Sequence, residues 1–105
     1  MKMFAKTPKP PYYAVIFTST LKSEDPEYDK MADLMVNLAT KQDGFLGIES
    51  ARSEVGITVS YWRDITAIKQ WKAQTDHQVA QSKGKHQWYS HYITRISKVE
   101  RDYQM

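Results

Sequence analysis

Residues 45–62 carry the clearest structural pattern in the chain and read Phe-Leu-Gly-Ile-Glu-Ser-Ala-Arg-Ser-Glu-Val-Gly-Ile-Thr-Val-Ser-Tyr-Trp. Residues 45–52 alternate well enough for a strand, and residues 57–62 alternate between two faces. The second strand has Ile57, Val59 and Tyr61 on one face and Thr58, Ser60 and Trp62 on the other. Residues 54–56, Glu-Val-Gly, make a short turn between the strands. The stretch therefore predicts a β-hairpin.

Two elements precede this hairpin. Residues 12–19, Tyr-Tyr-Ala-Val-Ile-Phe-Thr-Ser, are rich in aromatic and β-branched side chains and predict a first strand. Pro26 suits a first helical turn, and the acids beside it suit the positive end of a helix dipole. An apolar stripe at helical spacing follows and stops before Gly44. The stripe consists of Met31, Leu34, Met35 and Leu38. A helix is therefore expected to join the first strand to the hairpin.

Further elements follow the hairpin. Asp64 predicts the N-cap of a second helix that ends near Thr75. Asp76 then predicts the cap of another short helix, before a last strand that runs to about Arg101. The expected marks of the short helix are burial of Val79 and Ala80 and a stop at Gly84.

The resulting order of strand, helix, strand, strand, helix, strand is typical of the ferredoxin-like α+β fold. Its four-stranded sheet is antiparallel and carries both helices on one face. Because a chain of this size supplies only two main helices, the other face needs a cover. We expect a homodimer that packs sheet against sheet.

Composition places the chain among ordinary globular domains. Its 105 residues predict one domain, 41% of them are apolar, and there is no cysteine. The lack of cysteine excludes disulfides, thiolate metal sites and a thiol nucleophile, and it fits the cytoplasm. The longest apolar run, residues 12–17, is far shorter than a membrane-spanning helix, and no signal peptide is recognisable.

The net charge of +3 resides in the N-terminal segment. Lys2, Lys6 and Lys9 lie in the first eleven residues without any acid, which leaves 12 basic and 12 acidic residues elsewhere. Basic and acidic side chains alternate in that remainder, so no stripe that would bind nucleic acid is expected. We expect residues 1–11 to form a mobile, proline-containing tail and residues 12–105 to form the domain.

The chain resembles the antibiotic biosynthesis monooxygenase family, and looks like one bacterial branch of small uncharacterised proteins within it. The resemblance covers about Tyr12 to Tyr103. It is carried by residues 13–17, 31–35, 42–52 and 56–62, then by the run 68–72, His77, Gly84, Trp88-Tyr, Arg95 and residues 99–103. It implies a dimeric α+β barrel whose protomers pair through their sheets. Characterised members of that family include cofactor-free oxygenases of polyphenolic compounds and haem-degrading enzymes.

The haem-degrading branch of that family uses a strand Asn, a helix Trp and a haem-ligating His ten residues after the Trp. Trp71 matches that Trp, but Gln81 stands at the position of the His, and Asn37 is the chain's only Asn. An amide oxygen is a poor iron ligand beside an imidazole nitrogen. His77 would serve only with a different helix register. No cofactor is therefore expected, and haem is disfavoured.

A cofactor-free oxygenase needs a desolvated site, a base that generates an electron-rich anion, and donors that stabilise it. His77 is the candidate base because imidazole exchanges protons near neutral pH, and Trp71 is the candidate orienting donor. The alternative is that His77 only caps or packs a helix end.

Further side chains are candidates for lining a cavity around an aromatic substrate: Tyr61, Trp62, Trp88, Tyr92, Met35 and Arg95. Arg95 would hold a substrate oxyanion, or else pair with Glu49 on a neighbouring strand. The aromatic rings and Met35 would alternatively serve only the core and the dimer interface.

No metal site is expected. His86 and His91 are five residues apart, and no third ligand stands at helical or strand spacing. The sequence also lacks phosphate-binding loops and serine-hydrolase motifs. We therefore expect oxygenation of a small aromatic or quinol-type substrate. The alternatives are a non-catalytic dimer that binds an aromatic, a quinone or haem, and a structural dimer that fills its own cavity.

Overall fold

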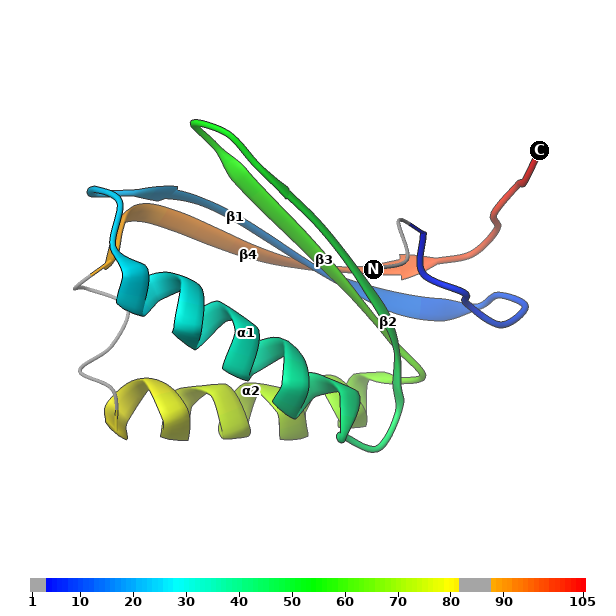
Figure 1. Ribbon diagram of the computed structural model, residues 1–105. Coiled ribbons are helices and arrows are strands. Elements are labelled where there is room, and N and C mark those ends of the chain that lie inside the picture. The colour runs from blue at the N-terminus through cyan, green and yellow to red at the C-terminus, as the bar shows by residue number, and fades with distance from the viewer. Residues whose placement is uncertain (1–3, 82–87) are drawn as a thin grey trace.

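The computed structural model describes residues 4–81 and 88–105, and side chains in 4–77 and 88–105 (Figure 1). Six elements follow the chain: β1 (Tyr12–Leu21), α1 (Pro26–Thr40), β2 (Phe45–Arg52), β3 (Gly56–Trp62), α2 (Ile65–Gln81) and β4 (Tyr89–Val99). The predicted order of strands and helices is confirmed.

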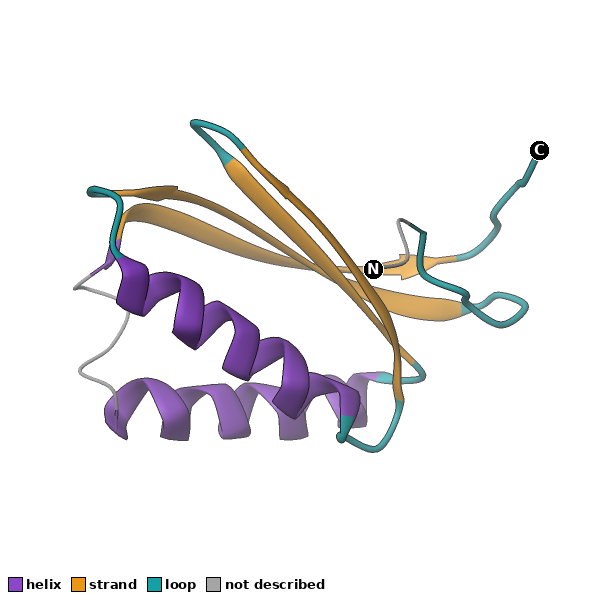
Figure 2. Cartoon of the chain, viewed as in Figure 1, coloured by secondary structure: helices purple, strands orange, loops and turns teal. Residues whose placement is uncertain are grey.

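The four strands form one antiparallel sheet in the order β2-β3-β1-β4, which is the ferredoxin-like topology. Both helices lie on one face of this sheet (Figure 2). We call this the helix face and the opposite one the open face. The expected α+β class and the one-sided helix layer are thereby confirmed.

An aspartate caps the start of each helix, and the cap at Asp64 was predicted. Asp25 is the N-cap of α1 and its carboxylate accepts a hydrogen bond from the Glu27 backbone N–H at 2.9 Å. Asp64 does the same for α2 through the Ala67 backbone N–H at 2.8 Å. Gly44 precedes β2 with a φ of 85°, a conformation in which a side chain is strained. These positions fix where the helices begin and the hairpin starts.

The second helix is longer than predicted. α2 runs without interruption to Gln81, so the expected end at Thr75 and the new cap at Asp76 are wrong. Asp76 instead pairs within the helix with Lys72, whose Nζ lies 2.6 Å from Oδ1. Gly84 and the side chains of Val79 and Ala80 lie outside the described residues.

The core lies between α2 and the sheet. Trp62 is fully buried and stacks on Trp71 of α2, with ring centroids 5.6 Å apart. Phe45 meets Trp62 edge to face, with ring centroids 5.5 Å apart. The Trp62 indole N–H donates to Ser60 Oγ at 2.9 Å, so this buried polar group is satisfied. Trp62 therefore anchors α2 on β3.

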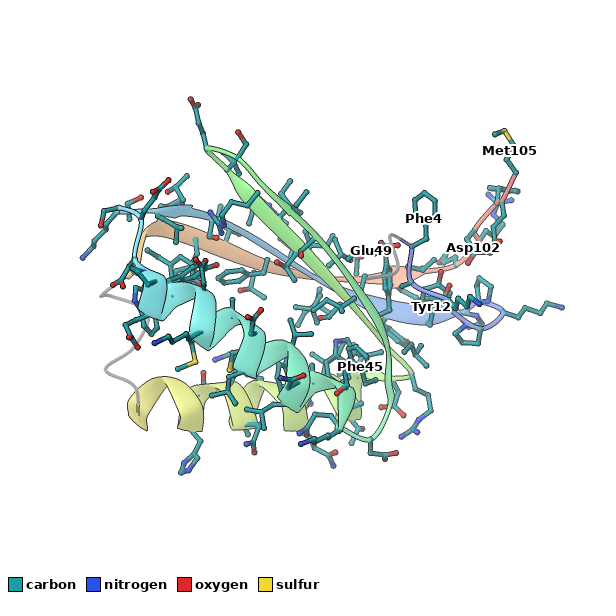
Figure 3. The ribbon with its side chains drawn as sticks, in the orientation of Figure 1. Phe4, Tyr12, Phe45, Glu49, Asp102 and Met105 are labelled. Carbon is teal, nitrogen blue, oxygen red and sulfur yellow. The ribbon has the colours of Figure 1, made fainter. Side chains whose placement is uncertain are left out.

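Both chain ends contact the open face near one end of the sheet. The Ala5 backbone N–H donates to Glu49 Oε2 at 3.0 Å. Thr7 donates to the Tyr12 hydroxyl at 3.1 Å, and that hydroxyl donates to Asp102 at 2.7 Å (Figure 3). The sequence predicts a mobile tail over residues 1–11, whereas residues 5 and 7 are anchored on the sheet.

Candidate functional site

Strand alternation places Tyr61 and Trp62 on opposite faces of the sheet. Trp62 lies in the core, whereas Tyr61 lies on the open face, where its hydroxyl donates to Glu49 Oε1 at 2.6 Å. Burial and the Glu49 carboxylate raise the Tyr61 pKa well above its usual range. The two residues proposed together for substrate binding therefore cannot line one site.

Trp71 and His77 do not share a face of α2. Trp71 is half-buried against Trp62, while His77 is exposed. Six residues at about 100° each turn the chain to a position about 120° round the helix from Trp71. The fold does not bring the two side chains together. No observation tests their catalytic roles, which stay predictions.

Arg95 lies on the open face, in register with Ile16 of β1. Glu49 belongs to β2, so two strands separate it from β4. The hydrogen bonds of Glu49 come from Tyr61 and Ala5. Pairing of Arg95 with Glu49, one of the two alternatives for this residue, does not occur.

The remaining predicted residues lie on the helix face. Met35 is half-buried on α1, and Tyr92 belongs to an aromatic cluster near the start of that helix. We call this the Trp88 cluster, and it consists of Phe17, Tyr28, Trp88, Tyr89 and Tyr92. Neighbouring rings in it have centroids 5.4–6.1 Å apart, mostly edge to face. Residues from β1, from α1 and from the start of β4 thus meet in one aromatic cluster.

Trp88 is the buried member of this cluster, with 7% of its surface exposed. Its backbone oxygen accepts from the Lys22 N–H at 2.8 Å, which joins it to the end of β1. Its indole N–H is buried and finds no acceptor among the residues that the structure describes. A buried donor without an acceptor loses the hydrogen bond that water would give it. Among the described residues, the Trp88 indole N–H is thus the one buried side-chain polar atom that no hydrogen bond satisfies.

Arg52 lies at the edge of the cluster and was not predicted as a site residue. Its guanidinium lies 5.6 Å from the Tyr28 ring centroid, as in a cation–π pair. Nη2 donates to Ser19 Oγ at 2.5 Å, and Nη1 lies 3.4 Å from the Ser19 carbonyl oxygen. The usable signal was alternation, which places Arg52 on the helix face with Ile48 and Ser50.

Two tyrosine hydroxyls complete the polar part of the cluster. The Tyr89 hydroxyl donates to the Tyr28 hydroxyl at 3.5 Å, and Arg52 Nη2 lies 3.4 Å from the same Tyr28 oxygen. Burial, with a smaller contribution from Tyr28, raises the Tyr89 pKa well above its usual range. Tyr89 therefore stays a neutral donor at physiological pH.

Neither metal ligation nor a membrane span finds support in the described part of the chain. No group of three potential ligand side chains gathers there. His91 lies on β4 and His77 on α2, both exposed, while His86 and the side chain of Gln81 fall outside the described residues. Within residues 4–81 and 88–105, no helix is both long and apolar enough for a bilayer.

Comparison with known proteins identifies relatives of this chain. It is 50% identical over 103 residues to YqjZ, an uncharacterized protein of Bacillus subtilis (strain 168), and the match covers 96% of this chain and 90% of that protein. The chain belongs to the YqjZ family. No protein-family model matches it. The crystal structure of PA3566 from Pseudomonas aeruginosa is similar with a TM-score of 0.67 at 17% identity, over 90% of this chain and 98% of that one. The ferredoxin-like fold of this YqjZ-family chain thus recurs in a solved protein.

Proposed function

We propose that the protein binds a small planar aromatic or quinol-type molecule at the Trp88 cluster and oxygenates it with molecular oxygen. The observation that carries the binding is the buried Trp88 N–H without an acceptor in the described chain. The ring of an aromatic ligand would pack against Phe17 and Tyr28, and an oxygen of the same ligand would accept a hydrogen bond from the Trp88 indole N–H. The reaction type comes from the resemblance to the antibiotic biosynthesis monooxygenase family, which stays a hypothesis.

The reaction balances without a reductant if the substrate supplies all four electrons that reduce O2. A ring C–H of a phenol becomes C=O, so that the phenol becomes a quinone. One oxygen atom enters the ring, and the other leaves as water with the two displaced hydrogens. The chain's own part is to hold the phenolate form, whose developing charge on oxygen is stabilised by oriented N–H and O–H donors. Trp88 and Tyr89 are such donors.

Non-catalytic binding at the same cluster is the second candidate. It is favoured by the position of His77, the predicted base, which is exposed on α2 rather than directed to the side of the helix that holds Trp71. In this alternative the aromatic guest binds and leaves unchanged.

We also propose that two copies pair through their open faces. The support is apolar exposure, since Ile57 is 46% exposed and Ile93 39% exposed on that face. Pairing would leave the Trp88 cluster free, because the cluster lies on the helix face. The cytoplasmic location expected from the sequence is part of the same proposal.

Oxygen consumption tests the reaction. Purified protein is mixed with 1-naphthol in an oxygen electrode, and quinone formation is followed by absorbance. We expect uptake above the uncatalysed rate, and its loss in Trp88→Phe, which keeps a ring but removes the N–H. Binding by calorimetry without any uptake would favour the non-catalytic alternative, and absence of both would refute the proposal.

A further inference from the structure

We propose that Arg52 makes the Trp88 cluster selective for planar aromatic molecules that carry an ionised oxygen, either a carboxylate or a phenolate. This inference rests on the proposed function, because it names the class of molecule that the same site takes. Four observations support it. Arg52 has no acidic partner in the described chain, its neighbours fix its position, the hydrogen-bonding atoms around it are mostly donors, and the Tyr28 ring lies beside it.

Arg52 has no acidic partner in the described part of the chain. The ion pairs found there involve Lys30, Arg63 and Lys72. The partners of Arg52 are neutral oxygens, namely those of Ser19 and Tyr28. Its positive charge is therefore uncompensated beside the cluster, and an anion there would form charge-assisted hydrogen bonds.

Two small residues fix the position of the guanidinium: Ser19 accepts its hydrogen bonds, and Gly56 leaves room for it. Ser19, itself 2% exposed, accepts from both terminal nitrogens of Arg52 through its hydroxyl and its carbonyl oxygen. Gly56 lies opposite both Arg52 and Ser19 in the strand register, and a Cβ at Gly56 would overlap the guanidinium. The guanidinium therefore occupies the space that a Cβ at residue 56 would take, and a side chain there would displace it.

The polar atoms around the guanidinium are mostly donors. The Tyr28 hydroxyl oxygen accepts hydrogen bonds from Tyr89 and Arg52. No described residue accepts a hydrogen bond from the Tyr28 hydroxyl. The buried Trp88 N–H has no acceptor among the described residues, and the exposed Arg52 guanidinium donates there to Ser19 and Tyr28 alone. A ligand that satisfies these groups must bring acceptors, and an ionised oxygen is an acceptor only.

The ring beside the cation accounts for the aromatic part of the ligand. Tyr28 lies under the guanidinium and edge to face with both Trp88 and Tyr89. An aromatic anion can place its ring among these side chains while its oxygen reaches Arg52. An inorganic anion would gain only the second of these interactions.

Calorimetric titration with 2-naphthoate and with its neutral analogue 2-naphthamide tests the inference. We expect naphthoate to bind about tenfold more tightly than the amide. Arg52→Gln should remove this preference while the affinity for the amide is retained. Gly56→Ala should remove it too, because the guanidinium is displaced while its charge is kept. Arg101→Gln, an exposed arginine in the C-terminal segment, should change neither affinity.

The outcomes separate the two proposals. If both compounds bind equally to the native protein, or if Arg52→Gln weakens both equally, charge selection is refuted and aromatic binding stands. If neither compound binds, the proposed function fails and this inference fails with it. If Gly56→Ala keeps the full preference while Arg52→Gln abolishes it, Arg52 acts without the placement described here, and that step is overturned.

Discussion

Ile57 and Ile93 lie in one row across the open face, on either side of Thr18 in β1. They come from β3 and β4, and both are more than one-third exposed. Val59 and Ile16 form part of the next row. Exposed isoleucines in the middle of a sheet face that no helix covers are typical of an interface.

Dimerisation is expected to depend on the open face alone. Ile93→Glu should convert a dimer into monomers, because it places a charge within the proposed interface. Ile96→Glu is the matched control, since Ile96 is a 54% exposed isoleucine of the same strand that pairs with Val15 on the helix face. Sedimentation equilibrium should give a dimer for the native protein and for Ile96→Glu. A native monomer would contradict the proposed pairing.

Three tyrosines should ionise at higher pH in the folded state than in the unfolded state. Burial raises the pKa values of Tyr12, Tyr61 and Tyr89. A raised folded pKa contributes stability that is fully present below the unfolded value of about 10 and is lost as pH rises toward the folded value. Absorbance titration at 295 nm should show late-ionising tyrosines, together with a falling unfolding midpoint above pH about 10. Tyr61→Phe should remove one late group, and an unchanged late amplitude would contradict its assignment.

Acid should destabilise the protein through two carboxylates near the hairpin and α2. Arg63 lowers the pKa of Asp43, and the Ala67 N–H followed by Arg63 lowers that of Asp64. Depressed folded pKa values give stability that is present above the unfolded value of about 3.9 and is lost as pH falls through the folded values. The double variant Asp43→Asn, Asp64→Asn should show a flatter loss of thermal stability below pH 4. An identical acid profile would refute the two assignments.

The two buried tryptophans should respond differently to loss of the indole N–H. Trp62→Phe leaves Ser60 Oγ without its donor, whereas Trp88→Phe removes a donor that lacks an acceptor in the described structure. We therefore expect Trp62→Phe to lower the free energy of unfolding by about 1–3 kcal/mol more than Trp88→Phe. Urea denaturation measures both. A larger loss for Trp88→Phe would indicate that its N–H is bonded in the native protein.

Most of the fold follows from local patterns. Alternation in residues 57–62 correctly sorts side chains between the faces, and Asp64 acts as the predicted cap. Asp25, expected only to lie near the positive end of the helix dipole, also caps α1. The error at Asp76 has a physical reason. An Asp after a Thr resembles an N-cap, but four residues after Lys72 it stabilises a continuing helix equally well.

The site was less predictable than the fold. Alternation already separates Tyr61 from Trp62, so their joint assignment neglected a pattern that the sequence contains. The approach of Arg52 to Tyr28 was not predictable in this way. It depends on how the hairpin end, β1 and the start of α1 meet, which is a tertiary arrangement.

Isotope labelling shows whether the oxygen atom of the product comes from O2. The protein is incubated with 1-naphthol under 18O2, and the quinone and the water are analysed by mass spectrometry. We predict one 18O atom in each newly formed quinone and one in water, with the yield greatly reduced in Trp88→Phe. Quinone formed without 18O, or formed equally by Trp88→Phe, would contradict oxygenation at the Trp88 cluster.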